Sequence, residues 1–377
     1  MRIALLGAPG IIGSDIARRL VQEGQRDVLL ADRREEAAGA LAKRLGVESA
    51  AADVTDIAGT AKILKDCDLV VNATWYYFNV QAMEAALAAG CDYLDLGGLY
   101  HTTRKQLALH RRFEQAGLVG ILGCGKAPGI TNVLAAWGAQ RFDHLEAVHL
   151  RSGRKALEPT AGIKFPYSPQ TLFDELALKP VVLEGGILRE IEPLGRKETV
   201  HHGEPFGEID YIATLHSELA TLPKFLGKGL REMDFKVALA PETTKALDLL
   251  IQLGLASTTP IAVDGHRVIP RDVTGAILAG LPPVRGKEAW ITEVVMIGEA
   301  EGQPRSLELR VTGNETQNGT AIPAVVAAHL IREKKLRETA GVFAPETVLP
   351  AERFFHGLSA AGLKVTEICL EQRRLNS

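Results

Sequence analysis

The sequence predicts an α/β protein in which a doubly wound parallel sheet is joined to a second domain of the α+β class. The first third of the chain alternates short apolar segments with segments of helical periodicity, as parallel strands joined by crossover helices require. The middle of the chain loses this alternation and consists mostly of strand-like segments. We place the first domain at residues 1–128 and the α+β domain at residues 129–319.

The composition is that of a folded globular protein. Of 377 residues, 46% are hydrophobic and 24% are charged, and the formal net charge of −3 gives no reason to expect nucleic acid or a membrane as a partner. The four cysteines are widely separated, so neither a disulfide framework nor a metal site is predicted. No apolar run approaches the roughly 20 residues that cross a bilayer, and we identify no targeting segment. We therefore expect a cytoplasmic protein.

The chain opens with a buried strand, a glycine-rich turn and an amphipathic helix. The apolar run from Ile3 to Gly7 predicts the strand, and helical spacing begins at Ile12. Such a turn presents free backbone N–H groups at the positive end of a helix dipole, where a pyrophosphate binds. The predicted contacts to a dinucleotide are Gly7, Ala8, Pro9, Gly10, Ile11, Ile12 and Gly13. The alternative is a tight turn of small residues without a ligand.

An acidic residue follows the second expected strand, Asp27 to Ala31. Asp32 lies 19 residues beyond Gly13, close to the spacing of about 20 at which a carboxylate binds the adenosine ribose. Its charge favours NAD over NADP, because a carboxylate repels the 2′-phosphate. Arg33 and Arg34 oppose this prediction, since a guanidinium stacks on adenine or binds that phosphate. The alternative role of Asp32 is to cap the following helix.

Further parallel strands are expected at 47–52, 69–73, 93–96 and 118–122. Helices such as Val80 to Ala89 and Arg104 to Ala116 separate them. Ligands of doubly wound sheets bind at the carboxyl ends of the strands. The residues at two of those ends, Asp53, Val54, Asn72, Ala73 and Thr74, are therefore also predicted to bind the dinucleotide.

The strand-like segments after residue 129 have few helices between them. Six strands are expected between Leu145 and Thr312, with helices at about 169–178, 241–253 and 271–280. Two helical segments, Ile322 to Leu336 and Pro350 to Ala361, follow. We expect residues 320–377 to return to the first domain and to leave a cleft between the two domains.

Several motifs resemble those of the saccharopine dehydrogenase-like oxidoreductases. The motifs are GAPGIIG, LADR, DLVVNATWYYFN, DYLDLGG and GCGKAPGITN. Within that group the chain looks most like the NAD-dependent lysine 6-dehydrogenases. This closer likeness also uses the dipeptide His216-Ser217 and the segments VDGHRVIPRDV and FAPETVLP.

The resemblance implies a Rossmann domain, an α+β domain for substrate binding and dimerisation, and C-terminal helices that return to the first domain. It implies a homodimer that transfers hydride between NAD(H) and the amine-bearing carbon of a small amino acid. The alternatives are a saccharopine- or carboxynorspermidine-type reductase, which joins or splits two amino-acid units, and a non-catalytic dinucleotide sensor. At Lys126 and Ala127 the chain departs from residues common in the family, which leaves the substrate open.

Amine oxidation needs a group that removes a proton beside the nicotinamide. Lys126 is the first candidate, because its loop follows the sixth expected strand and burial lowers the pKa of a lysine. The alternatives are a carboxylate anchor or a solvated side chain. His216 is the second candidate, because imidazole titrates near neutral pH, and Ser217 and Glu218 are placed to orient it. The alternative is a structural histidine.

Two more residues are candidates for contact with substrate. Tyr77 follows the fourth expected strand and would cover the nicotinamide or hydrogen-bond the amine, or else pack in the core. Asp95 ends the fifth strand and would bind the substrate ammonium, or else cap its turn.

Candidate anchors for a substrate carboxylate and a histidine pair lie in the second domain. Arg154, Lys155 and Lys164 are possible anchors, and the sequence does not choose among them. His201 and His202 have no third ligand at a suitable spacing, which favours a polar loop over a metal site.

Overall fold

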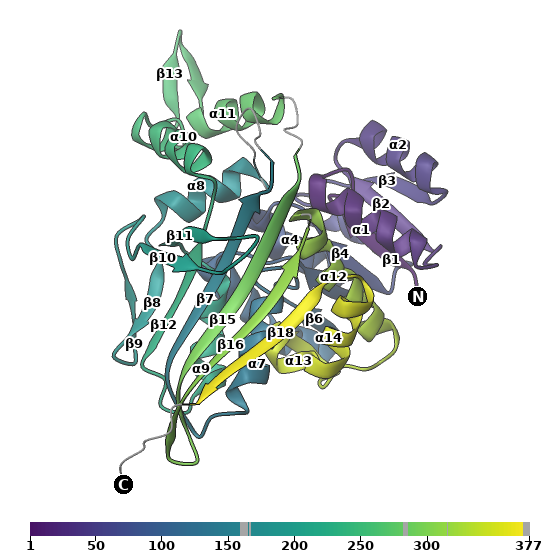
Figure 1. The fold of residues 1–377 in the computed structure, drawn as a ribbon. Coiled ribbons are helices and arrows are strands. Elements are labelled where there is room, and N and C mark those ends of the chain that lie inside the picture. The colour runs from purple at the N-terminus through teal and green to yellow at the C-terminus, as the bar shows by residue number, and fades with distance from the viewer. Residues whose placement is uncertain (159–164, 166, 282–285, 315, 372–377) are drawn as a thin grey trace.

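A seven-stranded parallel sheet forms the centre of the first domain (Figure 1). The structure is a computed structural model that describes residues 1–158, 165, 167–281, 286–314 and 316–371. The strands in sheet order are β17 (Gly341–Phe343), β6 (Val119–Ile121), β5 (Asp92–Asp95), β4 (Leu69–Asn72), β1 (Ile3–Leu6), β2 (Val28–Asp32) and β3 (Glu48–Ala51). The order reverses direction at β1, which creates the crevice where such sheets bind ligands.

Helices connect these strands and cover both faces of the sheet. They are α1 (Ile11–Gln22), α2 (Glu35–Leu45), α3 (Ile57–Leu64), η1 (Tyr76–Phe78), α4 (Asn79–Ala89), α5 (Tyr100–Leu107) and α6 (His110–Ala116). Every residue of β1 is buried, as a strand between two helical layers requires. The helix expected over residues 104–116 is two helices, α5 and α6, with a break at Ala108 and Leu109. The doubly wound sheet is confirmed.

A nine-stranded sheet forms the second domain. Its main path is β10 (Glu198–His201), β11 (Glu208–Ala213), β12 (Glu232–Val237), β7 (His144–Ala156), β15 (Glu288–Ala300), β16 (Gln303–Gly313) and β18 (Lys364–Glu371). Two short strands, β8 (Val181–Glu184) and β9 (Ile187–Glu190), continue from β12. The pair β12 and β7 is parallel and the other pairs are antiparallel.

A helical arm stands at one end of the second sheet (Figure 1). It contains α8 (Pro169–Ala177), α10 (Pro241–Gln252), α11 (Pro270–Ala279) and the hairpin of β13 (Ile261–Val263) and β14 (His266–Val268). Helix α8 packs against both α10 and α11. The arm therefore positions α8 at the end of the crevice between the domains, where it contributes to the site described below.

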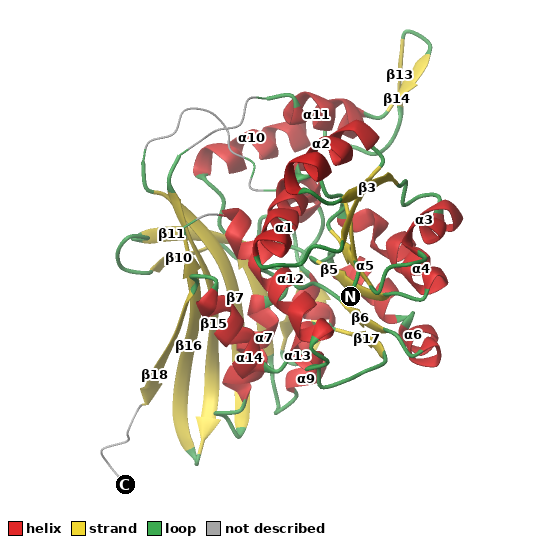
Figure 2. Cartoon of the chain, turned by 90° about the vertical axis from the view of Figure 1, so that its right-hand side faces the viewer, coloured by secondary structure: helices red, strands yellow, loops and turns green. Residues whose placement is uncertain are grey.

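Helices lie between the two sheets (Figure 2). They include α7 (Ile130–Ala139), α12 (Thr316–Arg332) and α14 (Ala351–Ala360), with the short α9 (Leu222–Leu226) and α13 (Pro345–Val348) beside them. Helix α12 packs on α1, β4 and β5 of the first domain and on β15 and β16 of the second. This confirms that a C-terminal helix returns to the first domain.

The C-terminal part of the chain also supplies two strands that the sequence analysis did not predict. β17 pairs with β6 and extends the parallel sheet, while β18 pairs with β16 and extends the second sheet. β17 has three residues, too few for a periodic pattern. The described residues from 320 to 371 therefore contact both sheets rather than the first domain alone. Among the described residues, no helix has the length and apolar character needed to span a bilayer.

Candidate active site

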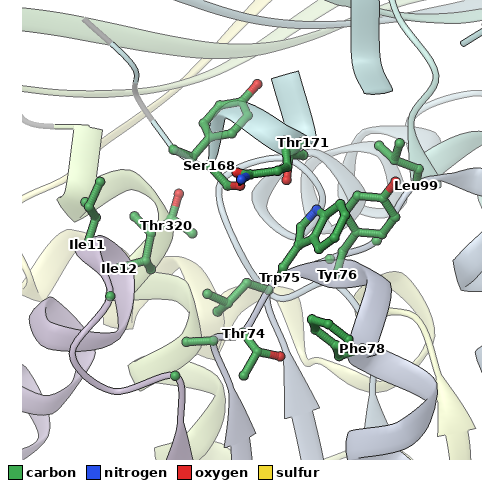
Figure 3. Close-up of a pocket in the computed structure, with 18 of the residues that line it drawn as sticks. Ile11, Ile12, Thr74, Trp75, Tyr76, Phe78, Leu99, Ser168, Thr171 and Thr320 are labelled. Carbon is green, nitrogen blue, oxygen red and sulfur yellow. The ribbon is translucent and has the colours of Figure 1, made fainter. Parts of the chain in front are cut away.

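A cavity of about 830 Å³ lies between the two domains. Ile11 and Ile12 line it from the start of α1, and on the other side of the view Trp75 and Tyr76 line it from the segment after β4 (Figure 3). Thr171 lines it from α8. Residues of the parallel-sheet domain and of the α+β domain thus face one enclosed space.

The glycine turn makes the dinucleotide end of the cavity. Gly7 has φ +75°, and an added Cβ would lie 2.7 Å from the carbonyl oxygen of Ala73. At Gly13 an added Cβ would lie 2.3 Å from the carbonyl oxygen of Gly7. Only glycine therefore allows β1, β4 and α1 to approach this closely. Gly10 is the N-cap of α1, so the first-turn N–H groups of that helix face the position where a pyrophosphate binds.

Asp32 ends β2 at the edge of the same cavity. Its Oδ1 accepts hydrogen bonds from the backbone N–H of Arg34 at 2.9 Å and from Arg34 Nε at 3.0 Å. Arg33 and Arg34 also line the cavity. One carboxylate and two guanidinium groups thus lie together where the adenosine ribose of a dinucleotide would bind.

Most of the residues predicted to bind the dinucleotide line the cavity. These are Gly7, Gly10, Ile11, Ile12, Asp32, Arg33, Asp53, Val54, Ala73 and Thr74. Ala8, Pro9, Gly13 and Asn72 are not among the described residues that line it. Asn72 is 1% exposed and its Oδ1 accepts a hydrogen bond from Thr74 Oγ1 at 2.7 Å. It therefore shapes the turn that follows β4 instead of facing the cavity.

Lys126 lies in the loop between β6 and α7 and lines the cavity. The residue is 8% exposed, and its Nζ lies 5.3 Å from the centre of the Trp290 ring. Burial, followed by the positive charge of Arg154, lowers the pKa of Lys126 to about 7. Both the charged and the neutral amine are then populated near neutral pH, so this side chain can accept or donate a proton.

His216 follows β11 and also lines the cavity. Its Nδ1 hydrogen-bonds the carboxylate of Glu218, and its ring stacks on Phe235 with ring centres 3.7 Å apart. Burial opposes the charged form, but the carboxylates of Glu218 and Glu175 outweigh it and raise the pKa of His216 above its ordinary value. Ser217 Oγ has no hydrogen-bond partner among the described residues, so Glu218 alone fulfils the predicted orienting role.

Arg154 and Glu175 complete a charged cluster with Lys126 and His216. Arg154 lines the cavity near the end of β7, whereas the exposed Lys155 is not among the described residues that line it. Glu175, on α8, is 5% exposed and accepts a hydrogen bond from the Tyr167 hydroxyl at 2.6 Å. Burial raises the pKa of Glu175 above its ordinary value. The cavity therefore combines cationic and anionic side chains at the end away from the glycine turn.

Sequence analysis missed Glu175 and its neighbour Asp174. Both are buried on α8, among the apolar side chains of Leu172, Phe173 and Leu176. Two adjacent acids on an apolar helical face were the available signal, because buried carboxylates need specific partners. The sequence alone could not identify the partners of these two acids, because Tyr76 and Arg271, which bond Asp174, lie on distant segments.

Of the two tyrosines after β4, Tyr76 lines the cavity, whereas Tyr77, the predicted candidate, is not among the described residues that line it. Tyr77 is 60% exposed and stacks on Trp75, and it is not among the described residues that line the cavity. Tyr76 lines the cavity, and its hydroxyl donates to Asp174 Oδ2 at 2.6 Å. Asp174 in turn accepts a hydrogen bond from Arg271 on α11. Tyr76 therefore joins the first domain to the helical arm, whereas Tyr77 faces solvent.

Asp95 does not reach the cavity in the described structure. It is fully buried, with Oδ1 accepting from the backbone N–H groups of Gly97 at 3.0 Å and Gly123 at 2.6 Å. Its Oδ2 accepts from Gln106 at 2.6 Å. Burial raises the pKa of Asp95 despite these bonds. This geometry matches the capping alternative, because Oδ1 holds the turns that follow β5 and β6.

Lys155, His201 and His202 are not among the described residues that line the cavity. Lys155 is exposed, and Lys164 lies outside the described residues. His202 is buried, with Nε2 hydrogen-bonded to the Tyr211 hydroxyl at 2.9 Å and Nδ1 3.4 Å from Glu293. Within the described ranges, no cluster of three metal-ligating side chains occurs.

Two family models together match nearly the whole chain. Residues 3–121 match the saccharopine dehydrogenase NADP binding domain, and residues 125–363 match the saccharopine dehydrogenase C-terminal domain. The chain belongs to the saccharopine dehydrogenase family, as its motifs predicted.

Three similar proteins are informative. The chain is 25% identical to carboxyaminopropylagmatine dehydrogenase of Synechocystis sp. over 97% of each chain. It is 25% identical to carboxynorspermidine synthase of Vibrio cholerae over 82% of this chain and 75% of the other. Saccharopine dehydrogenase (L-Glu forming) of Saccharomyces cerevisiae has the same fold, with a TM-score of 0.75 and 15% identity over 98% of this chain and 99% of that one.

Proposed function

We propose that the protein oxidises or forms, reversibly, the carbon–nitrogen bond between a carboxylate-bearing unit and a cationic amine unit. The observation that carries this proposal is the charged cluster of Lys126, Arg154, Glu175 and His216 in the cavity that also contains the glycine turn. A guanidinium binds a carboxylate in a forked geometry, and a buried carboxylate binds an ammonium group. A substrate with both charges matches this end of the cavity.

The names of the similar proteins support the same class of substrate. Carboxyaminopropylagmatine and carboxynorspermidine are both, by name, polyamines that carry a carboxyl group. The alternative that joins or splits two units is therefore preferred here over the lysine 6-dehydrogenase activity implied by the closer resemblance. Free lysine also carries one carboxylate and one distal amine, so it remains the competing substrate in the test below.

The side chains of the cluster supply binding and proton transfer. When bound, the nicotinamide supplies the hydride chemistry at the substrate carbon. Lys126 removes the proton from the substrate nitrogen during oxidation and returns it during reduction, because its pKa of about 7 suits both directions. Arg154 holds the substrate carboxylate, which fixes the reacting carbon in position. His216 serves the second proton transfer, from the water that hydrolyses the resulting imine.

The choice of dinucleotide depends on Asp32, Arg33 and Arg34. We retain the prediction of NAD, because the Asp32 carboxylate is fixed at the end of β2 by Arg34 and faces the ribose position. The description of the matching family domain as NADP binding supports the other cofactor. Measuring the affinity of the protein for both dinucleotides by isothermal titration calorimetry decides between them.

A substrate panel tests the proposed function. The protein is incubated with NAD⁺ or NADP⁺ and, separately, carboxynorspermidine, carboxyaminopropylagmatine, saccharopine or lysine, and reduced nicotinamide is followed by absorbance. We expect the highest kcat/KM with one of the carboxylated polyamines. Turnover of lysine alone would establish the lysine 6-dehydrogenase activity instead. Dinucleotide binding without turnover of any compound would support the sensor.

The assembly and the compartment of the protein also stay predictions. The family resemblance implies a homodimer, and the scattered cysteines favour the cytoplasm. Sedimentation equilibrium with and without dinucleotide checks the homodimer. Fractionation of the cells that produce the protein checks the compartment.

A further inference from the structure

A second layer of buried groups lies behind His216. Glu218, on the short helix η2 (Ser217–Ala220), is completely buried. One of its oxygens, Oε2, contacts His216 Nδ1, while Oε1 accepts a hydrogen bond from Thr131 Oγ1 at 2.7 Å. Thr131 itself is completely buried, in the first turn of α7. Each oxygen of this carboxylate thus has a fixed partner.

The orientation of the His216 ring is determined from two directions. Glu218 accepts the hydrogen on Nδ1, so Nε2 is the nitrogen left to exchange protons with a ligand. Phe235, on β12, stacks on the ring at an interplanar angle of 13° and fixes its plane. His216 and Phe235 both line the cavity, whereas neither Glu218 nor Thr131 is among the described residues that line it.

The first turn of α7 connects this pair to the loop that carries Lys126. Asn132, adjacent to Thr131, accepts a hydrogen bond from the backbone N–H of Gly129 at 2.9 Å. Gly129 ends the loop that begins at Gly125, and Lys126 lies within it. Thr131 and Asn132, which are consecutive in α7, therefore bond Glu218, the partner of His216, and Gly129, at the end of the loop that carries Lys126.

We propose that Glu218, held by Thr131, is the positioning residue of His216 and directs its Nε2 into the cavity. Glu218 does not contact the substrate in this arrangement. It fixes the tautomer and the rotamer of the imidazole, as the third member of a nucleophile–base–orienter set does in other enzymes. This inference rests on the proposed function, in which His216 exchanges a proton with the water or the substrate.

The charged groups around His216 set the expected pH dependence. Glu218 faces it from η2, and Glu175 faces it from α8. Asp174 adjoins Glu175, and Glu346, from α13, faces Glu218. The cationic Lys126 and Arg154 belong to the same cavity cluster and interact with Glu175. Removing the Glu218 charge therefore lowers the pKa of His216, while Glu175 still raises it.

Two substitutions at Glu218 separate charge from geometry. Glu218→Gln keeps the shape and removes the charge, so we expect the pKa of His216 to fall by about one unit. Glu218→Asp keeps the charge but shortens the side chain by one methylene, so we expect a smaller pKa change. Both variants should lower kcat about tenfold to a hundredfold with little change in the affinity for dinucleotide. The NMR resonance of the His216 ring in the dinucleotide-free protein, assigned with His216→Asn, reports the pKa directly.

Substitutions at Thr131 and at Asp234, the partner of His149, provide the matched comparisons. Thr131→Val should lower kcat severalfold, and Thr131→Ser, which keeps the hydroxyl, should restore it. Asp234→Asn removes the carboxylate that bonds His149 Nδ1 at 2.9 Å outside the cavity. That control should leave the pH profile of kcat unchanged, whatever it does to the melting temperature.

The possible outcomes distinguish this inference from the proposed function. If the wild-type protein turns over none of the substrates, the proposed function fails, and the His216 titration still measures its pairing with Glu218. If the wild-type protein is active and both Glu218 variants leave kcat and the pKa of His216 unchanged, the positioning role is overturned. If Glu218→Gln does not fold, Glu218→Asp and the Thr131 pair decide.

Discussion

The two ends of the cavity differ in how their residues are distributed along the chain. The end with the glycine turn combines backbone groups with Asp32 and Arg33, whereas the other end collects charged side chains from distant segments. The end with the glycine turn is formed mainly by short segments, among them residues 10–12, 31–34 and 52–55. The opposite end takes Lys126, Arg154, Glu175 and His216 from four separate segments of the chain. We predict that the first end binds a dinucleotide chiefly through the N–H groups of the glycine turn and through Asp32, and that the second end binds substrate through charges whose pKa values depend on burial.

This difference predicts how each end responds to substitution. A larger side chain at the glycine turn should prevent dinucleotide binding, while the charged side chains at the other end keep their positions. At the charged cluster, removing one group should slow turnover while the dinucleotide still binds. The following substitutions test that separation, from the largest expected effect to the smallest.

Gly10→Val should abolish dinucleotide binding. A Cβ at Gly10 would lie 3.1 Å from the carbonyl oxygen of Gly7, so the turn can adjust and the domain should still fold. The branched side chain would cover the N–H groups at the start of α1. Calorimetric titration measures the affinity, and circular dichroism checks the fold. Gly39→Val is the control, since a Cβ there meets only Ser49 Oγ at 3.8 Å.

Lys126→Met should lower kcat by about 10²–10⁴, the range expected for a general base. Because the pKa of Lys126 is about 7, its neutral form increases as the pH rises through 7, and kcat for amine oxidation should rise with it. That limb of the pH profile should disappear in the variant. Lys155→Met makes the same change at an exposed position and should have no effect. A raised KM with unchanged kcat would instead make Lys126 an anchor.

Asp32→Ala should weaken NAD binding by roughly tenfold to a hundredfold, because a hydrogen bond to a charged group contributes about 1.5–3 kcal/mol. The variant also releases Arg34, so discrimination against NADP should decrease. Titration with both dinucleotides measures the two affinities. Glu35→Ala removes an exposed neighbouring charge and serves as the control. A wild-type preference for NADP would show that the two arginines determine the cofactor.

The smallest effects are expected at the tyrosine pair. Tyr76→Phe removes the bond to Asp174 that joins the first domain to α8, and we expect a severalfold rise in KM. Tyr77→Phe changes a hydroxyl on a side chain that is 60% exposed, and we expect no change. Steady-state kinetics of the two variants compare them directly. A larger effect at Tyr77 than at Tyr76 would contradict the placement of these rings.

The parallel sheet and its glycine turn were predictable because their signals are local. A strand buried on both faces is apolar throughout, and a close approach of three backbones requires glycine at Gly7 and Gly13. The acid at Asp32 followed from its spacing. The short strand β17 was not predictable, because its three residues are held by long-range contacts, the pairing with β6 and the packing on α6.

The sequence by itself determined the parallel-sheet fold, the glycine turn and the presence of Lys126 and His216 as proton-transfer candidates. Only the tertiary structure placed Glu175 and Arg154 beside them, excluded Asp95 from the cavity and placed Tyr76 rather than Tyr77 at the cavity. The physical reason is that steric requirements of the backbone act between neighbouring residues, whereas a pKa or an ion-binding geometry depends on which distant side chains share a buried volume. The lowered pKa of Lys126 shows this. Its two main causes are burial and the positive charge of Arg154, which lies on β7, distant in the sequence from the Lys126 loop.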